Sequence, residues 1–167
     1  MSALRIRKSE AELEGLARSA ALADQAMLAG ADACRPGVTE LDVAWAVKEH
    51  FFRNGAESVD FVIVASGPNG AFPHHETGSR QIQPGEPIIL DTGATLDGSK
   101  SDIPRVIHRG EPSAKVRDAY QAVLKANRRG RQAAVAGARA CDVDRAARQT
   151  LESAGYGPYF VHRTGHG

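Results

Sequence analysis

The sequence has few cysteines and no apolar leader. Its two cysteines, Cys34 and Cys141, cannot supply the disulfide framework that a small secreted domain needs, and neither belongs to a CxxC pair. The amino terminus, MSALRIRKSEAELEG, is charged and lacks the apolar run of a signal peptide. We therefore expect a reduced, cytoplasmic setting in which both cysteines are ordinary packing residues.

The chain also lacks an imbalance of charge and a long hydrophobic run. Lys and Arg total 21 against 20 Asp and Glu, and the formal net charge of +1 gives no general attraction to nucleic acid or to a membrane surface. One basic cluster has the spacing of a solvated helix face: Lys125, Arg128, Arg129 and Arg131. With 42% hydrophobic and 25% charged residues, the composition is that of one globular domain or a large piece of one.

Apolar periodicity predicts two helices in the first third of the chain. The spacing of Ser9 and Glu12 is that of a capping box, which begins a helix that runs to about Ala33. Its apolar face is predicted to comprise Leu13, Leu16, Ala20, Ala23, Met27 and Leu28. A second helix is expected from Thr39 to Asn54-Gly55, which suits a left-handed helix end.

Strands are predicted next, at Asp60 to Ala65, Pro87 to Asp91 and Ser101 to His108. Between the first two lies Gly67-Pro68-Asn69-Gly70, which lacks the lysine and following helix of a phosphate-binding loop and is interpreted as a turn beside a functional site. Asp97-Gly98 favours a hairpin between the last two.

The order of elements then repeats. Helices are predicted from about Ser113 to Ala136 and from Asp142 to Ala154, followed by an apolar strand at Tyr159 to Val161. A faint sequence echo between residues 30–34 and 137–141 supports an ancestral duplication. If the halves correspond, the second half stops just after its strand, and a second hairpin of about 40 residues would follow it.

Asp91 and Asp102 are candidate metal ligands. An ionised carboxylate at the end of an apolar strand needs a positive or strongly hydrogen-bonding partner. A turn centred between Leu96 and Asp97 would set the two carboxylates opposite one another, roughly 5 Å apart at Cβ, where a divalent cation would relieve their repulsion. The alternative is that Asp91 begins the turn and Asp102 pairs with Lys100 or Arg105 at the surface.

A histidine near the end of the chain extends this donor set. His166 lies between two glycines, so a metal or substrate could approach it closely, although a lone histidine is more often structural. Carboxylates together with an imidazole suit Mn, Co, Fe or Zn.

Four segments in this order resemble a known group: PHH at 73–75, LDTGA at 90–94, SDIPR at 101–105 and HRTGHG at 162–167. They are similar to the creatinase and methionine aminopeptidase superfamily, in its Xaa-Pro dipeptidase and Xaa-Pro aminopeptidase branch. The resemblance implies an α+β "pita-bread" fold, in which duplicated helix-helix-strand halves surround a curved antiparallel sheet. Residues 1–167 would form the catalytic domain, without its last hairpin and without the separate amino-terminal domain of that branch.

The resemblance also implies roles for individual residues. Asp91 would chelate one metal, Asp102 would bridge two metals and His166 would bind the second, with two glutamates expected beyond Gly167. His74 would contact substrate and assist proton transfer, and His75 is the less favoured member of that pair. His162 would bind substrate and stabilise the transition state.

The implied activity is hydrolysis of the bond before proline, in short peptides with proline at the second position. Two divalent ions, with Mn favoured over Co, Fe or Zn, would hold a bridging water, lower its pKa and polarise the carbonyl, so no serine or cysteine nucleophile is required. A homodimer is expected. Because only three of five ligands are covered, we expect weak metal binding and little activity from this chain. The alternatives are a non-catalytic binding module and a metal-free, creatinase-like hydrolase.

The chain departs from the family pattern at the second aspartate. Pro104 replaces the usual threonine of the SDxTR motif and removes a backbone donor from its strand. Ser99 and Lys100 replace a turn that commonly contains tyrosine.

Overall fold

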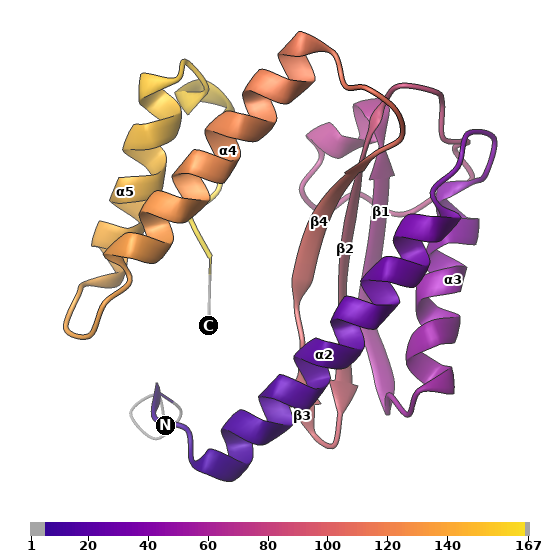
Figure 1. Cartoon of the computed structure of the whole chain (residues 1–167), viewed down its shortest axis with the longest axis horizontal. Helices are drawn as coiled ribbons and strands as arrows, with labels where there is room; N and C mark the ends of the chain where they lie inside the picture. The colour runs from indigo at the N-terminus through magenta and orange to yellow at the C-terminus, as the bar shows by residue number, and fades with distance from the viewer. Residues whose placement is uncertain (1–5, 166–167) are drawn as a thin grey trace. The chain divides into compact units, whose positions relative to one another are not determined.

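The computed structural model describes residues 6–165, which fall into two compact units (Figure 1). Unit 1 is Met1–Glu111 and unit 2 is Pro112–Gly167. Each unit has its own hydrophobic core. No helix in the described residues is long and apolar enough to cross a membrane.

Unit 1 begins with two capped helices, α2 (Glu10–Ala33) and α3 (Glu40–Arg53). Both begin with the reciprocal bonds of a capping box, Ser9 with Glu12 and Thr39 with Asp42, which satisfy backbone donors that have no partner within the helix. Gly55, just after α3, has a φ of 91°, as expected for a left-handed helix end. The predicted bounds of both helices are confirmed.

An antiparallel sheet follows, with β2 at its centre. It consists of β1 (Ser58–Ser66), β2 (Pro87–Leu96), β3 (Ser99–Lys100) and β4 (Ile103–His108), and a short 3-10 helix, η1 (Gly67–Ala71), follows β1. β1 pairs with one edge of β2, and β3 and β4 pair with the other. Asp97 and Gly98 both have positive φ, 48° and 70°, so they form the tight hairpin turn that their sequence predicted.

Helices α2 and α3 pack against one face of this sheet (Figure 1). Alternate residues of β2 face them, and Ile88, Leu90, Thr92 and Ala94 are all buried. From α3, Val43, Val47 and Phe51 join this core with no exposed surface. The intervening residues of β2 therefore project from the other face.

The buried face of α2 agrees with the predicted one only in part, since Ala23 and Met27 are buried as predicted. Leu13 and Leu28 are 54% and 67% exposed, whereas Gly15, Ser19 and Gly30 are buried. A Cβ at Gly30 would lie 2.5 Å from a side-chain carbon of Leu90, so the helix lies too close to the sheet for a larger residue there. The prediction is wrong for Leu13 and Leu28, because close packing against the sheet selected small residues instead.

Unit 2 is a pair of helices, α4 (Ala114–Ala133) and α5 (Ala140–Ser153), followed by the 3-10 helix η2 (Gly157–Tyr159). Its buried core contains Ala122, Ala126, Ala147 and Leu151. The strand predicted at Tyr159 to Val161 is wrong, because η2 and irregular chain occupy this segment and Val161 is 83% exposed. The described part of unit 2 contains no strand to supply ladder hydrogen bonds.

The two cysteines have different environments. Cys34 caps the end of α2 and is buried, and this burial raises the pKa of its thiol to about 11, against a smaller opposing effect of Arg109. Cys141 is exposed on α5. The prediction that both are packing residues is therefore wrong for Cys141.

Candidate functional site

Asp91 lies on the face of the sheet that is turned away from α2 and α3. It is half-buried and is paired in register with Ile63 of β1 and Pro104 of β4. Because side chains alternate along a strand, Ile89 and Gly93 project from the same face of β2. We call this surface the outer face: Ile89, Asp91, Gly93, Asp102 and Pro104.

The prediction that Asp102 lies directly opposite Asp91 is wrong, because Asp91 pairs with Pro104. The turn is centred between Asp97 and Gly98, one residue later than expected, and the register therefore shifts by two residues. Continuing the ladder from Ile103, which pairs with Thr92, sets Asp102 opposite Gly93. A shift of two preserves the face, so Asp91 and Asp102 are diagonal neighbours at about 7–8 Å instead of 5 Å.

Pro104 does not weaken the hydrogen bonding between β2 and β4, although the sequence suggested that it would. The backbone N–H of Ser101 donates to Ala94 O at 2.9 Å, so this is a hydrogen-bonded pair. Such pairs alternate with non-hydrogen-bonded ones along an antiparallel ladder, and Asp91 with Pro104 falls in the second class. An N–H at position 104 would point away from β2, so proline removes no bond between these strands.

Asp91 and Asp102 are suited chemically to a divalent cation. Their carboxylates are hard oxygen donors, and the two residues occupy diagonal positions on the same face of the sheet. Two cations near Asp102 in the sequence form ion pairs: Lys100 lies 2.9 Å from Asp60 and Arg105 lies 3.8 Å from Asp24. Within residues 6–165, no three His, Cys, Asp or Glu side chains gather as a metal-ion site.

The loop between β1 and β2 carries His74. Its first part, η1, approaches the outer face, because a Cβ at Gly70 would lie 3.3 Å from Ile89 Cδ1. His74 is exposed, whereas the side chain of His75 retains only 15% of its exposure. The two histidines of the pair therefore have separate environments.

Glu40, at the start of α3, is the acceptor for His75 and has no exposed surface. Five groups donate to its carboxylate: Ser66 N and Oγ at 2.7 Å, His75 Nε2 at 2.9 Å, Asn69 Nδ2 at 3.0 Å and Gly78 N at 3.4 Å. Burial is the largest single influence and opposes ionisation, but the hydrogen bonds together outweigh it and lower the Glu40 pKa to about 2. Glu40 is therefore an ionised, fully buried acceptor.

An ion pair extends this network toward β2. Arg80 donates to both carboxylate oxygens of Glu86 at 2.6 and 2.8 Å, and also to Ser66 Oγ at 2.6 Å. The Ser66 hydroxyl thus accepts from Arg80 while it donates to Glu40. Burial acts to raise the pKa of Glu86, but the bonds from Arg80 and the Gln83 backbone outweigh it, so that the pKa is lowered.

In unit 2, an ion pair holds the segment that carries His162. Arg148 bonds Asp144 from α5, lies 4.6 Å from the centre of the Phe160 ring, and donates to Phe160 O and His162 O. Asp144 also accepts from Thr164 N at 2.7 Å. Hydrogen bonds from Arg148 and then Thr164 lower the Asp144 pKa to about 2. His162 itself is exposed, and His166 lies outside the described residues.

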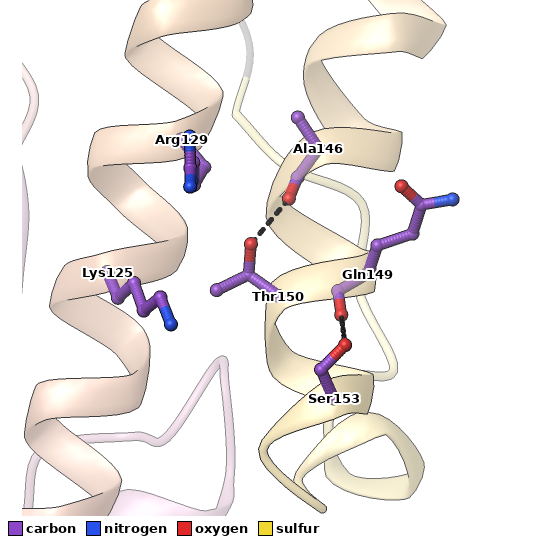
Figure 2. A pocket seen from close by; sticks show the side chains of 6 residues that line it. All are labelled: Lys125, Arg129, Ala146, Gln149, Thr150 and Ser153. Atoms are coloured by element: carbon purple, nitrogen blue, oxygen red, sulfur yellow. Dashed lines mark hydrogen bonds between the residues drawn. The ribbon is translucent and has the colours of Figure 1, made fainter.

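A hollow lies between α4 and α5, and His162 is not among the residues that line it (Figure 2). Its lining includes the exposed Lys125 and Arg129 of the basic cluster. The hydroxyls of Thr150 and Ser153 each donate to a carbonyl one turn earlier, at 2.8 Å. Their protons are therefore already used within α5.

Sequence reasoning missed Glu40 and Arg148. Acidic residues are common in the first turn of a helix, because their charge interacts favourably with the helix dipole. Glu40 therefore did not stand out in the sequence as a functional residue. Arg148 was hidden in the same way among the charged residues of an amphipathic helix. Two donors to Glu40 were singled out beforehand: Asn69 was interpreted as part of a turn, and His75 as the less favoured histidine of its pair.

Comparison with known proteins gives this arrangement a family. The chain matches metallopeptidase family M24 over residues 14–167. It is 40% identical to a probable dipeptidase PepE of Mycobacterium tuberculosis over 98% of this chain, and 38% identical to a Xaa-Pro dipeptidase of Pyrococcus furiosus over 98%. The solved structure of dipeptidase PepE from Mycobacterium ulcerans matches 99% of the chain with a TM-score of 0.95 and 40% identity.

A second solved structure, prolidase from Pyrococcus furiosus, matches 95% of the chain with a TM-score of 0.92 and 37% identity. The chain spans less than half the length of these relatives, 44% and 47% of the two dipeptidases and 45% and 48% of the two structures. The expected α+β, pita-bread type of fold is confirmed over this part. The chain belongs to metallopeptidase family M24.

Proposed function

We propose that the protein is a metal-dependent peptidase that cleaves the bond between an amino-terminal residue and proline. The observation that carries this proposal is the register of the hairpin, which leaves Asp91 and Asp102 as diagonal neighbours on one face. The names of its relatives, which include Xaa-Pro dipeptidase and prolidase, support the substrate class. Short peptides with proline at the second position are the proposed substrates.

Asp91 and Asp102 would hold divalent cations, with His166 as a further ligand. Manganese is the first choice because carboxylate oxygens dominate this donor set, and Co, Fe and Zn also accept it. Bound divalent ions would acidify water and polarise the scissile carbonyl, which supplies the chemistry that a side-chain nucleophile would otherwise provide.

Two histidines would serve the substrate. His74 is exposed on the loop that approaches the outer face, where its imidazole could contact the peptide and move a proton. His162 would bind the peptide from the segment that Arg148 holds. A homodimer and a cytoplasmic setting remain predictions, which light scattering and cell fractionation would test.

The first experiment measures hydrolysis of Ala-Pro by the complete protein that the reading frame encodes. Mn²⁺ should support hydrolysis and a chelator should abolish it. Asp102→Asn should lower kcat/KM by about 100-fold or more, because a neutral amide replaces a charged ligand. Metal content, measured by elemental analysis, should fall in the same variant.

Asp97→Asn is the matched control, because it makes the same change at the tip of the same hairpin. Asn tolerates the positive φ of 48° at this position, so activity should persist. Hydrolysis that survives metal removal, or an Asp102→Asn variant as active as Asp97→Asn, would refute the proposal.

A further inference from the structure

His74 occupies a short turn that hydrogen bonds define on both sides. His75 N donates to Phe72 O at 3.1 Å, which closes a four-residue turn with His74 at its third position. Pro73 precedes His74 and fixes φ at the second position of the turn. On the other side, Phe72 N donates to Asn69 O at 3.1 Å. The backbone conformation at His74 therefore depends on the residues that flank it.

Both flanks bind the same carboxylate. Asn69 Nδ2 lies 3.0 and 3.2 Å from the two oxygens of Glu40, and His75 Nε2 lies 2.9 Å from one of them. The exposed His74 is thus held between two anchors that meet at one buried side chain. A displacement of Glu40 would release the segment on both sides at once.

Glu40 is itself fixed by the helix and by the end of the loop. Its backbone N–H donates to Arg80 O at 3.0 Å, and the next N–H, from Leu41, donates to Gly78 O at 3.1 Å. These bonds satisfy two donors of the first turn of α3 that have no partner within the helix. The start of α3 is therefore joined to the loop through both backbone and side chain.

We propose that Glu40 is a positioning residue, which orients the His74 imidazole for substrate by fixing Asn69 and His75 on either side of it. This inference rests on the proposed function, since it assigns Glu40 a part in that reaction through His74. Glu40 contacts no reacting group, and its effect passes through the turn.

The chemistry of the network gives this proposal a spectroscopic signature. An ionised carboxylate only accepts hydrogen bonds, so His75 must carry a proton on Nε2. Glu40→Gln keeps the size of the side chain but turns an NH₂ group toward neighbours that are themselves donors. The ¹⁵N shifts of His75 should therefore change in this variant, and its Nε2 proton signal should be lost or move.

Amide hydrogen exchange in the 167-residue chain tests the placement of the turn directly. In Glu40→Gln, exchange at Ser66, His75 and Gly78 should be about 10-fold faster or more, as expected for the loss of a hydrogen bond to a charged group. Exchange at Leu90 in β2 should be unchanged. Glu49→Gln is the matched control, since it makes the same change at an exposed position of the same helix. It should change exchange neither in the loop nor in β2.

Asn69→Ala is the second test variant, to be used if Glu40→Gln loosens the whole fold and raises exchange in β2 as well. It removes one anchor and leaves the buried carboxylate with its other donors, and exchange at His75 should still rise severalfold. Unchanged exchange at residues 72–78 in both variants would overturn the proposal.

Kinetics of the complete protein link the turn to the reaction. Glu40→Gln should lower kcat by about 10–100-fold, with a smaller change in KM, because a small displacement of a positioned group has effects of this size. In a His74→Ala background, Glu40→Gln should add little further loss, since the two residues act as one unit. Fully additive losses would overturn the positioning role.

The two proposals fail separately. If the wild-type protein releases no residue from Ala-Pro, the proposed function fails whatever the exchange rates. If it is active but Glu40→Gln lowers neither protection of the turn nor kcat, the positioning role fails and the proposed function stands.

Discussion

At the scale of residues, one buried carboxylate has a larger structural role than its position in the sequence indicates. Glu40 is ionised inside the fold because five donors surround it and together offset the cost of burial. Loss of this carboxylate would leave buried donors without an acceptor, which is more damaging than the loss of an exposed ion pair. Arg148 has a similar role in unit 2, where it joins Asp144 to the chain around His162.

The low pKa of Glu40 predicts how stability depends on pH. The folded pKa, about 2, lies below the reference value of 4.5, so the stabilisation is complete above pH 4.5 and is lost as pH falls through about 2. The free energy of unfolding of wild type should exceed that of Glu40→Gln most at pH 6, and the gap should narrow by about 3 kcal/mol toward pH 2.

Urea denaturation at pH 6, 4 and 3 measures this gap. Other carboxylates with lowered pKa values, such as Asp60 and Glu86, are common to both proteins and cancel in the difference. A gap that is constant with pH would contradict the assignment of an ionised Glu40.

At the scale of elements, the hairpin of β2 and β4 places the candidate metal ligands. Gly93 lies two residues after Asp91 on β2. It pairs with Phe61 of β1 on one side and lies opposite Asp102 on the other. A Cβ at Gly93 would lie 2.4 Å from Ser101 O and 2.6 Å from the Phe61 ring. Only glycine allows the strands to approach this closely next to Asp102.

Gly93→Ala should therefore displace the backbone of Ser101 and Asp102. Overpacking of this kind typically costs about 1–3 kcal/mol of stability, and urea denaturation should show a loss in that range. Gly78→Ala is a suitable control, since its Cβ would meet no atom closer than 3.8 Å and its φ is not positive. Equal stability of the two variants would show that the hairpin can absorb the methyl group without cost.

At the scale of the whole molecule, the two units differ in how much apolar surface they bury. Among the described residues, the core of unit 1 contains 15 buried residues from two helices, two strands and the loops around them, whereas the core of unit 2 contains four. Three of those four are alanines, which bury little area each. Tyr120, Val123 and Val135 of unit 2 remain between 48% and 65% exposed.

Hydrogen exchange of the 167-residue chain should reveal this difference. Amides of β2 should be protected at least about 100-fold more than those of α4 and α5, because regions with few buried apolar contacts open at lower free energy. Mass spectrometry of exchanged peptides would measure both units in one sample. Equal protection would mean that the units unfold together as one cooperative structure.

Two things about this protein follow from the sequence alone: its local structure and the family to which it belongs. The capping box at Ser9, the helix start at Thr39 and the Asp97-Gly98 turn depend on neighbouring residues, so their predictions hold in the structure. The family motifs are likewise short, and they led from PHH and LDTGA to metallopeptidase family M24. The roles of Asp91, Asp102, His166, His74 and His162 remain proposals.

Only the tertiary structure decided the contacts between distant segments. The strand register depends on where the turn is centred, and an error of one residue there moved Asp102 from opposite Asp91 to opposite Gly93. The buried face of α2 depends on how closely the sheet approaches it, which favoured Gly30 over Leu28. Glu40 became an anchor for His75 because folding brings its donors together across 35 positions of sequence, a distance over which local patterns carry no information.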